Sequence, residues 1–320
     1  MSTVHNPEIF EKIRELKKEK NAVLLAHYYQ LPEIQEMADY VGDSLILAQK
    51  AREVKADRIV LAGVHFMAET AKIINPSKKV LLPDPEAGCS LADSCPIEAF
   101  QAFKKNYPGY TVISYVNTTA EIKTETDIVC TSSNALAIVN ALPPQEKILF
   151  APDRNLGNYI QRMTGRENMV IWDGACHVHE EFSLEKMLEL KKRHPEAKII
   201  AHPECKKPIL IAADFIGSTK EMLDFSIKDF SMIYIVATEP GILHQMKKAS
   251  PKKLFIPAPP VDSTCGCNDC RYMKLITPEK ILLSLQRDQF EVKIEESVRV
   301  AAERPILRML EMSSSLGLIR

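Results

Sequence analysis

Three short stretches decide the fold: residues 38–44 read ADYVGDS, residues 126–132 read TDIVCTS, and residues 213–219 read ADFIGST. The second stretch lies 88 residues after the first, and the third lies 87 residues after the second. An aspartate holds the same place in each, at Asp39, Asp127 and Asp214. Self-similarity at a fixed spacing is typical of repeated structural units. The sequence therefore predicts three similar modules.

Each module carries the pattern of a small parallel sheet. Four short apolar segments recur in the same order, separated by amphipathic stretches long enough for a crossover helix. The predicted strands are Val23–Ala26, Tyr40–Gly42, Arg58–Ala62 and Val80–Leu82; Thr111–Tyr115, Ile128–Cys130, Lys147–Ala151 and Met169–Trp172; and Lys198–Ala201, Phe215–Gly217, Met232–Ala237 and Lys253–Ile256. We predict an α/β fold of three similar three-layer αβα domains, arranged with pseudo-threefold symmetry around a common site.

The predicted domains follow the repeat. We expect α/β domains at residues 1–103, 104–190 and 191–275, and C-terminal helices at residues 276–320 that pack back on the body. Asn6-Pro7 and Thr277-Pro278-Glu279 each combine a capping residue with proline at the first helical position, which predicts a helix start. No low-complexity segment or linker interrupts the chain, so we expect the modules to be tightly joined.

Composition indicates an ordinary soluble protein. Of the 320 residues 46% are hydrophobic and 26% are charged, and the formal net charge is −1. Without a long basic run, nothing favours nucleic acid or an anionic membrane as a partner. The apolar stretches are strand-sized and the N-terminus is charged, so we expect a cytoplasmic protein with neither membrane span nor signal peptide. The eight cysteines should then be thiols rather than disulfides.

Polar side chains gather where the predicted strands end, which is where parallel α/β sheets bind ligands. The first strand of each module leads into His27, Tyr115 or His202, and the second leads into Ser44, Ser132, or Ser218 and Thr219. A hydroxyl at a helix N-terminus can hold a carboxylate or a phosphate, but it can also simply cap the helix. Because three such positions lie in register, both interpretations stay open.

The cysteines follow the repeat as well. Cys89 and Cys176 follow the fourth strand of their modules, 87 residues apart, and the third module carries Cys265, Cys267 and Cys270. That C-x-C-x-x-C run alone fits half of a zinc site, a redox pair or a cluster ligand. Three thiolates at a common junction fit a [4Fe-4S] cluster with one open iron that can act as a Lewis acid.

The remaining cysteines have a structural interpretation. Cys95, Cys130 and Cys205 are predicted to be small buried or loop thiols, and Cys130 lies inside a predicted strand.

The chain closely resembles the quinolinate synthase family over essentially its whole length. The resemblance rests on Ala26-His27-Tyr28-Tyr29, Gly42-Asp43-Ser44, Pro85-Glu86-Ala87-Gly88-Cys89-Ser90-Leu91, Ser114-Tyr115-Val116-Asn117, Cys130-Thr131-Ser132-Ser133-Asn134, Cys176-His177-Val178-His179-Glu180, His202-Pro203-Glu204-Cys205 and Gly217-Ser218-Thr219. It implies three α/β domains around a central iron–sulfur cluster. It also implies condensation of iminoaspartate with dihydroxyacetone phosphate to quinolinate, with loss of phosphate and two waters, in de novo NAD biosynthesis.

The resemblance also implies a ligand set and a partner. The cluster ligands correspond to Cys89, Cys176 and Cys270, because Cys270 precedes a Tyr-Met-Lys run as the family ligand does. The family has proline where this chain has Arg271, so Cys267 is the alternative third ligand. Because iminoaspartate hydrolyses readily, the resemblance implies functional coupling to L-aspartate oxidase.

Roles can be carried over for the substrate pocket. The matching residues are His27, Tyr29, Ser44, Tyr115, Asn117, Ser132, His179, His202, Glu204, Ser218 and Thr219. We expect Glu204 and Tyr29 to be the main acid/base pair, and His202 and His27 to orient substrate or relay protons. The alternative for His179 is a residue that supports the Cys176 loop, and for Glu204 it is a surface carboxylate.

Two other classes of function are compatible with parts of the sequence. Another [4Fe-4S] hydro-lyase would use the open iron on a small hydroxy acid, but it would not need hydroxyls for a phosphate in three modules. A non-catalytic zinc module would explain the run from Cys265 to Cys270 and leave Cys89 and Cys176 unused. Radical chemistry with S-adenosylmethionine is disfavoured because the chain has no C-x-x-x-C-x-x-C run.

Overall fold

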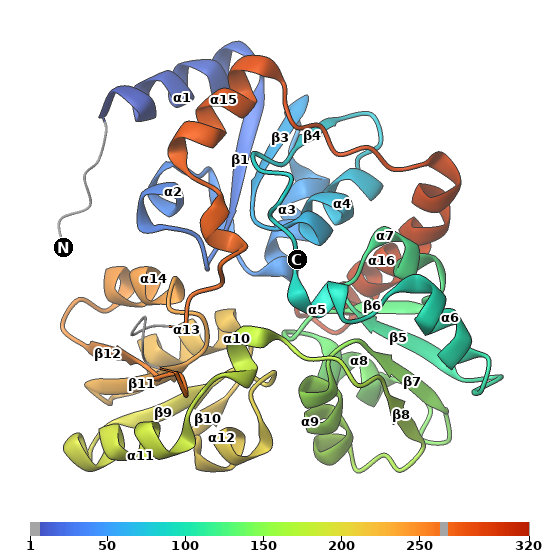
Figure 1. Cartoon of the computed structure of the whole chain (residues 1–320), viewed down its shortest axis with the longest axis vertical. Helices are drawn as coiled ribbons and strands as arrows, with labels where there is room; N and C mark the ends of the chain where they lie inside the picture. Colours follow the sequence, from blue (N-terminus) through green and yellow to red (C-terminus); the bar gives the residue numbers. More distant parts are fainter. Residues whose placement is uncertain (1–6, 263–267, 320) are drawn as a thin grey trace.

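The chain folds into three lobes, each built around its own sheet (Figure 1). The computed structural model describes residues 7–262 and 268–319, so Asn6, Cys265 and Cys267 lie outside the described residues. Every strand of the three sheets is parallel to its neighbours. This confirms the predicted α/β fold of three similar modules.

The three sheets share one topology. In each, the second strand lies at an edge beside the first, followed by the third and the fourth. The strands are β1 (Ala22–His27), β2 (Tyr40–Gly42), β3 (Arg58–Ala62) and β4 (Lys79–Leu81); β5 (Thr111–Tyr115), β6 (Ile128–Cys130), β7 (Ile148–Ala151) and β8 (Met169–Ile171); and β9 (Lys198–Ala201), β10 (Phe215–Ile216), β11 (Ile233–Ala237) and β12 (Leu254–Pro257). The predicted ranges agree to within about one residue at each end, the margin at which strand ends are defined.

Helices cover both faces of these sheets. They are α1 (Pro7–Glu19), α2 (Pro32–Met37), α3 (Ser44–Glu53), α4 (His65–Ile73), α5 (Ser90–Asp93), α6 (Ile97–Lys104), α7 (Ala120–Thr124), α8 (Ala135–Ala141), α9 (Arg154–Thr164), α10 (His177–Glu180), α11 (Leu184–Arg193), α12 (Lys207–Ala212), α13 (Thr219–Lys228) and α14 (Ile242–Ala249). In the third module Ile199 and Ile235 belong to one buried cluster, and Ile200 and Val236 belong to another. Alternate residues of each strand therefore face two apolar layers, as a three-layer arrangement requires.

The aspartate column of the repeat has the same structural role three times. The side chains of Asp39, Asp127 and Asp214 accept hydrogen bonds of 2.7–2.8 Å from backbone N–H groups at the start of β1, β5 and β9. Each aspartate lies just before the second strand of its sheet, so its carboxylate ties that strand to the first. The repeated sequence thus fixes the register of the edge strand in each module.

The helix before each first strand packs on the module that follows it. Phe100 of α6 is fully buried among residues of the second module such as Val112 and Leu149, and Met187 of α11 is buried with Ile199 of the third. The predicted boundary after residue 103 lies within α6, and the boundary after residue 190 lies within α11.

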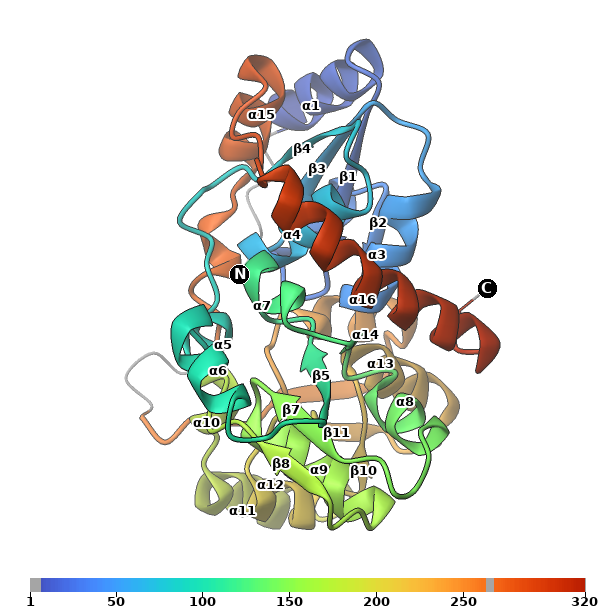
Figure 2. The same ribbon diagram turned by 90° about the vertical axis from the view of Figure 1, so that its right-hand side faces the viewer.

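The C-terminal part consists of a short 3-10 turn, η1 (Met273–Leu275), followed by α15 (Pro278–Arg287) and α16 (Glu296–Ser315). Helix α15 packs beside α1, and α16 crosses from the first module to the second, where it contacts α7 and β6 (Figure 2). The buried side chains of α16, such as Ile306, join the cores of these two modules into one cluster. Among the described residues, none of the helices combines the length and the apolar character needed to cross a membrane.

Candidate active site

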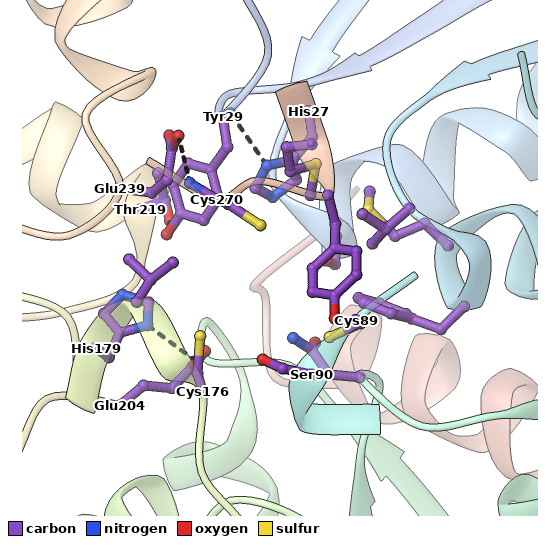
Figure 3. A pocket seen from close by; sticks show the side chains of 18 of the residues that line it. His27, Tyr29, Cys89, Ser90, Cys176, His179, Glu204, Thr219, Glu239 and Cys270 are labelled. Carbon is purple, nitrogen blue, oxygen red and sulfur yellow. Dashed lines mark hydrogen bonds and ion pairs between the residues drawn. The ribbon is translucent and has the colours of Figure 1, made fainter. Parts of the chain in front are cut away.

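One pocket lies where the first strands of the three sheets end. Strand β1 ends at His27, β5 ends at Tyr115, and β9 is followed by His202, and all three side chains line the pocket. Every predicted site residue lines this pocket except Ser218. Figure 3 shows the sulfur atoms of Cys89, Cys176 and Cys270 facing a common space between the modules. The structure therefore brings together residues that the repeat places about 87 positions apart.

The three cysteines have similar local structures. Cys89 and Cys176 immediately precede the short helices α5 and α10, and Cys270 lies just before η1. In each case one or two backbone amides of the following turn favour the thiolate and lower its pKa. Burial nevertheless raises the pKa of Cys89 to about 12, and it raises the pKa of Cys176 and of Cys270 as well. Thiolates at these positions therefore need more positive charge than the surrounding protein supplies, and a bound metal would provide it.

The residues that follow the cysteines also contact one another. The hydroxyl of Ser90 lies 2.7 Å from Nδ1 of His177. The ring of His177 meets that of Tyr272 edge to face, with 6.0 Å between their centroids. These contacts connect the three cysteine segments, so the position of one thiol depends on the other two loops.

The hydroxyl residues divide into two columns of the repeat. Ser44, Ser132 and Thr219 hold equivalent positions and line the pocket. Ser218 lies one position earlier, and its side chain accepts the N–H of Glu221 at 3.3 Å as the N-cap of α13. Its equivalent in the first module, Asp43, caps α3 in the same way. The capping interpretation therefore describes Ser218, whereas its neighbours in the next column can face a ligand.

Two buried histidines, His27 and His202, have the same hydrogen bond at Nδ1, which leaves Nε2 of each ring for the pocket. Nδ1 of His27 accepts the backbone N–H of Tyr29 at 3.1 Å, and Nδ1 of His202 accepts that of Glu204 at 3.4 Å. Burial lowers the pKa of His27 and that of His202 to about 3, so both rings are neutral at neutral pH. With Nδ1 as acceptor, the ring proton lies on Nε2, where it can be donated to a ligand.

Glu204 is buried, with only 3% of its surface exposed, so its interpretation as a surface carboxylate is wrong. The hydroxyl of Tyr115 donates to Oε1 of Glu204 at 2.6 Å, and Nδ1 of His179 lies 3.2 Å from Oε2. Burial opposes the charge, but the adjacent imidazole of His179 and the hydrogen bond from Tyr115 outweigh it and hold the pKa of Glu204 below its ordinary value. The carboxylate is therefore ionised at neutral pH and can accept a proton.

A chain of close polar contacts connects Tyr29 to Glu204. The Tyr29 hydroxyl lies 2.9 Å from that of Thr219 and 2.7 Å from that of Thr238, and Thr238 lies 3.1 Å from Nε2 of His179. Because His179 also contacts Glu204, the predicted acid/base pair is linked through two intermediates rather than directly. Burial raises the pKa of Tyr29 well above its ordinary value, so its hydroxyl stays protonated. The chain can transmit a proton between the first and third modules.

Asn117 supplies a further polar atom. Its Oδ1 is buried, and within the described part of the chain it has no hydrogen-bond partner. Since Asn117 lines the pocket, this oxygen is available to a ligand.

Comparison with known proteins identifies a family that matches nearly the whole chain. The family model described as Quinolinate synthetase A protein matches residues 11–311. The chain is 58% identical over 306 residues to a quinolinate synthase of Rippkaea orientalis, covering 96% of this chain and 94% of that protein. It is 60% identical over 301 residues to one of Synechocystis sp., covering 94% of each. It is 56% identical over 306 residues to one of Chloroherpeton thalassium, covering 96% of this chain and 95% of that protein.

The chain belongs to the quinolinate synthetase A family. The resemblance first seen in the motifs is thereby confirmed.

In this member of the family, sequence reasoning missed polar residues that follow the third strands. Thr238 and Glu239 follow β11, and Glu239 lines the pocket at 0% exposure. Asp153 follows β7 in the second module and is also fully buried, capping α9. The signal in the sequence that marks these positions is a charged side chain shortly after a buried strand.

Three side chains of the pocket lie close enough together to hold a single metal ion. One ligand atom each of Cys176, His179 and Glu204 lies within 4.8 Å of the others. Within the described residues, this is the group close enough for one ion, and it includes neither Cys89 nor Cys270. A single ion would therefore leave two of the three pocket thiols unused. The other described cysteines, Cys95, Cys130 and Cys205, are buried away from the pocket, in agreement with their structural interpretation.

Proposed function

We propose that the protein condenses iminoaspartate with dihydroxyacetone phosphate to form quinolinate, releasing phosphate and two waters, for NAD biosynthesis. The observation that carries this proposal is that three thiols, one from each module, share a pocket with hydroxyls, neutral imidazoles and an ionised carboxylate. The relatives that match nearly the whole chain are named quinolinate synthases. An L-aspartate oxidase would be the source of the unstable iminoaspartate.

The pocket suits small anionic substrates. Ser44 and Thr219 occupy the first positions of α3 and α13, where free backbone N–H groups and the helix dipole favour a carboxylate or a phosphate. Ser132 adds a hydroxyl from the second module, and Asn117 adds an amide. Together these groups can hold two substrates at one junction.

Proton transfer falls to the chain that joins Tyr29 and Glu204. Enolisation, imine formation and dehydration each require a proton to be removed or returned. Glu204 is ionised and can accept a proton, while the Tyr29 hydroxyl is protonated and can donate one. His27 and His202 can orient substrate oxygens through their Nε2 protons.

The donor set fits a [4Fe-4S] cluster held by Cys89, Cys176 and Cys270. Three half-buried thiols that line one pocket, each beside the backbone amides of the following turn, match the thiolate ligation of such clusters. When bound, the cluster would supply a Lewis-acidic iron for a substrate oxygen.

Two alternatives make different predictions. A single ion on Cys176, His179 and Glu204 would occupy the carboxylate that we assign to proton transfer. Another [4Fe-4S] hydro-lyase would use the same thiols but would not need the set of hydroxyls at the helix N-termini. Metal content separates the first alternative, and the product formed separates the second.

The test is anaerobic reconstitution followed by an assay with dihydroxyacetone phosphate and freshly generated iminoaspartate. We expect about four irons and four sulfides per chain, together with quinolinate formation. Cys89→Ala should lose cluster and turnover, whereas Cys95→Ala, at a thiol outside the pocket, should keep both. A protein that loads one zinc, or a loaded cluster that forms no quinolinate, would refute the proposal.

A further inference from the structure

Glu239 is a fully buried carboxylate that the proposed chemistry leaves without a role. It follows β11 directly after Thr238, is 0% exposed and lines the pocket. A carboxylate in this environment costs free energy unless it is paired and hydrogen-bonded. Its partners therefore indicate what it does.

The partners of Glu239 lie in different parts of the site. Its Oε1 lies 2.7 Å from Nζ of Lys274 and accepts the backbone N–H of Cys270 at 3.3 Å, a contact that Figure 3 marks. Its Oε2 accepts the N–H of Gly241 at 2.7 Å. One carboxylate thus contacts a candidate cluster ligand, the segment that follows it, and the loop after β11.

Lys274 extends these contacts to the first module. Its Nζ also donates to the backbone carbonyl of Tyr29 at 2.5 Å. A Cβ atom on Gly241 would lie 2.7 Å from two backbone atoms of Tyr29, so only glycine allows this close approach. Buried Gln35 donates to the carbonyls of Gly241 and Tyr28, which joins the two loops once more. The backbone of Tyr29 is therefore held by the same loop that holds Cys270.

We propose that Glu239, through Lys274 and Gly241, is a positioning residue that fixes the Cys270 ligand and the Tyr29 hydroxyl relative to each other. The inference rests on the proposed function, because it assigns Cys270 to a cluster and Tyr29 to proton transfer. Two neighbouring residues contact different parts of Tyr29. Thr238 contacts its hydroxyl, and Glu239 pairs with Lys274, which donates to the backbone carbonyl of Tyr29.

Stability alone does not account for this ion pair. Buried ion pairs are often no more stabilising than apolar residues of the same size, so stability by itself is a weak reason for this pair to be present. Hydrogen bonds to the groups around a metal ligand typically change metal affinity or activity by about 10- to 100-fold. The pair of Glu239 and Lys274 makes such hydrogen bonds to the backbone of the candidate ligand Cys270 and of the proton donor Tyr29.

The chain offers a matched control. Glu69 of α4 is also buried, at 6% exposure, and accepts the backbone N–H of Ala120 at 3.0 Å. The positive charge of buried Lys123 favours its ionised form. It does not line the pocket. Glu69→Gln therefore changes a buried carboxylate near a lysine without touching the Cys270 or Tyr29 loops.

The experiment combines amide exchange of the metal-free protein with cluster loss from the reconstituted protein. For Glu239→Gln and Lys274→Met we expect faster hydrogen exchange in peptides that contain Cys270 and Tyr29, and bleaching by an iron chelator about 10-fold faster than in the parent. Lys274→Arg keeps the charge and the hydrogen-bond donors, so its cluster should bleach about as slowly as that of the parent. Glu69→Gln should change neither property.

Each outcome bears on the inference. Glu239→Gln protein that exchanges and bleaches like the parent overturns the inference and leaves the proposed function intact. Equal acceleration in Glu69→Gln also overturns it, since a general loss of stability would then suffice. A parent protein that binds no iron overturns the proposed function and this inference together.

Discussion

Replacing Thr238 with valine tests the chain of polar contacts between Tyr29 and Glu204. Valine keeps the shape of threonine and removes the hydroxyl that lies 2.7 Å from Tyr29 and 3.1 Å from Nε2 of His179. Tyr29 retains Thr219 at 2.9 Å, so its ring should stay in place. His179 is 2% exposed, and its Nε2 would be left without a partner. The change therefore breaks the chain while disturbing little else.

The expected magnitudes follow from these contacts. An unsatisfied buried nitrogen costs about 1–3 kcal/mol, so we expect the free energy of unfolding of Thr238→Val to fall by that amount. General acid/base catalysis typically contributes about 10²- to 10⁴-fold, and breaking the path while keeping both end groups should cost near the lower limit. We expect kcat to fall about 100-fold, which corresponds to about 3 kcal/mol in the activation barrier.

The assay measures initial rates of quinolinate formation under anaerobic conditions, normalised to iron content, with urea unfolding of the same samples. Thr238→Ser is the control, because it keeps the hydroxyl and loses only the methyl group. Thr238→Val protein with full iron and a kcat within about twofold of the parent, a change of less than about 0.5 kcal/mol, would refute a role for this hydroxyl in proton transfer. A serine variant as slow as the valine variant would attribute the effect to packing.

Ser44→Ala should raise KM for the phosphorylated substrate and leave the free energy of unfolding nearly unchanged. Ser218→Ala removes a helix cap, so it should leave KM unchanged and lower the free energy of unfolding by about 1 kcal/mol. The opposite pattern would show that Ser218 binds the substrate and Ser44 caps its helix. Asp288→Asn should destabilise the protein at pH 7 by about 1–3 kcal/mol, because three basic side chains contact its carboxylate. They hold the pKa of Asp288 below its ordinary value, so this difference in urea unfolding should shrink as pH falls below about 4, and a constant difference would contradict the assignment. Lys123→Met removes a buried ammonium that donates to the main-chain carbonyls on both sides of Asn117. The free energy of unfolding of the metal-free protein should fall by about 2–3 kcal/mol, and KM should rise. Unchanged values would show that Lys123 does not hold the Asn117 loop in place.

Much of the fold could be predicted because the repeat is preserved in residues with a structural task. The Asp39, Asp127 and Asp214 carboxylates tie two strands together in every module, so their spacing locates the sheets. The strands themselves are buried on both faces and appear as continuous apolar runs. The helices that begin modules were harder to assign, since α6 and α11 follow one sheet in sequence and pack on the next.

The site could be predicted where equivalent residues carry similar chemistry, and not where they diverge. The third strands show this: Gly63-Val64 follows β3, Pro152-Asp153 follows β7 and Thr238-Glu239 follows β11. Asp153 and Glu239 are both buried carboxylates, but the first module has no charged residue there, so the repeat does not mark this position in all three modules. Ser218 was a different problem, because one position at a helix start separates a capping side chain from one that faces the pocket, and sequence alone does not resolve it.

The hydrogen bonds of the site are also the contacts that join the modules at their centre. Each pair of modules is connected by side chains that line or adjoin the pocket: Ser133 donates to Asp43 at 2.6 Å, Tyr115 donates to Glu204 at 2.6 Å, and Tyr29 bonds Thr238 at 2.7 Å. No single module holds more than one of the three pocket thiols among the described residues. Anything bound by all three therefore binds only the docked arrangement, and by linkage it must stabilise that arrangement. The same residues would then serve catalysis and assembly, so substitutions in the pocket should alter how the modules pack as well as what they bind.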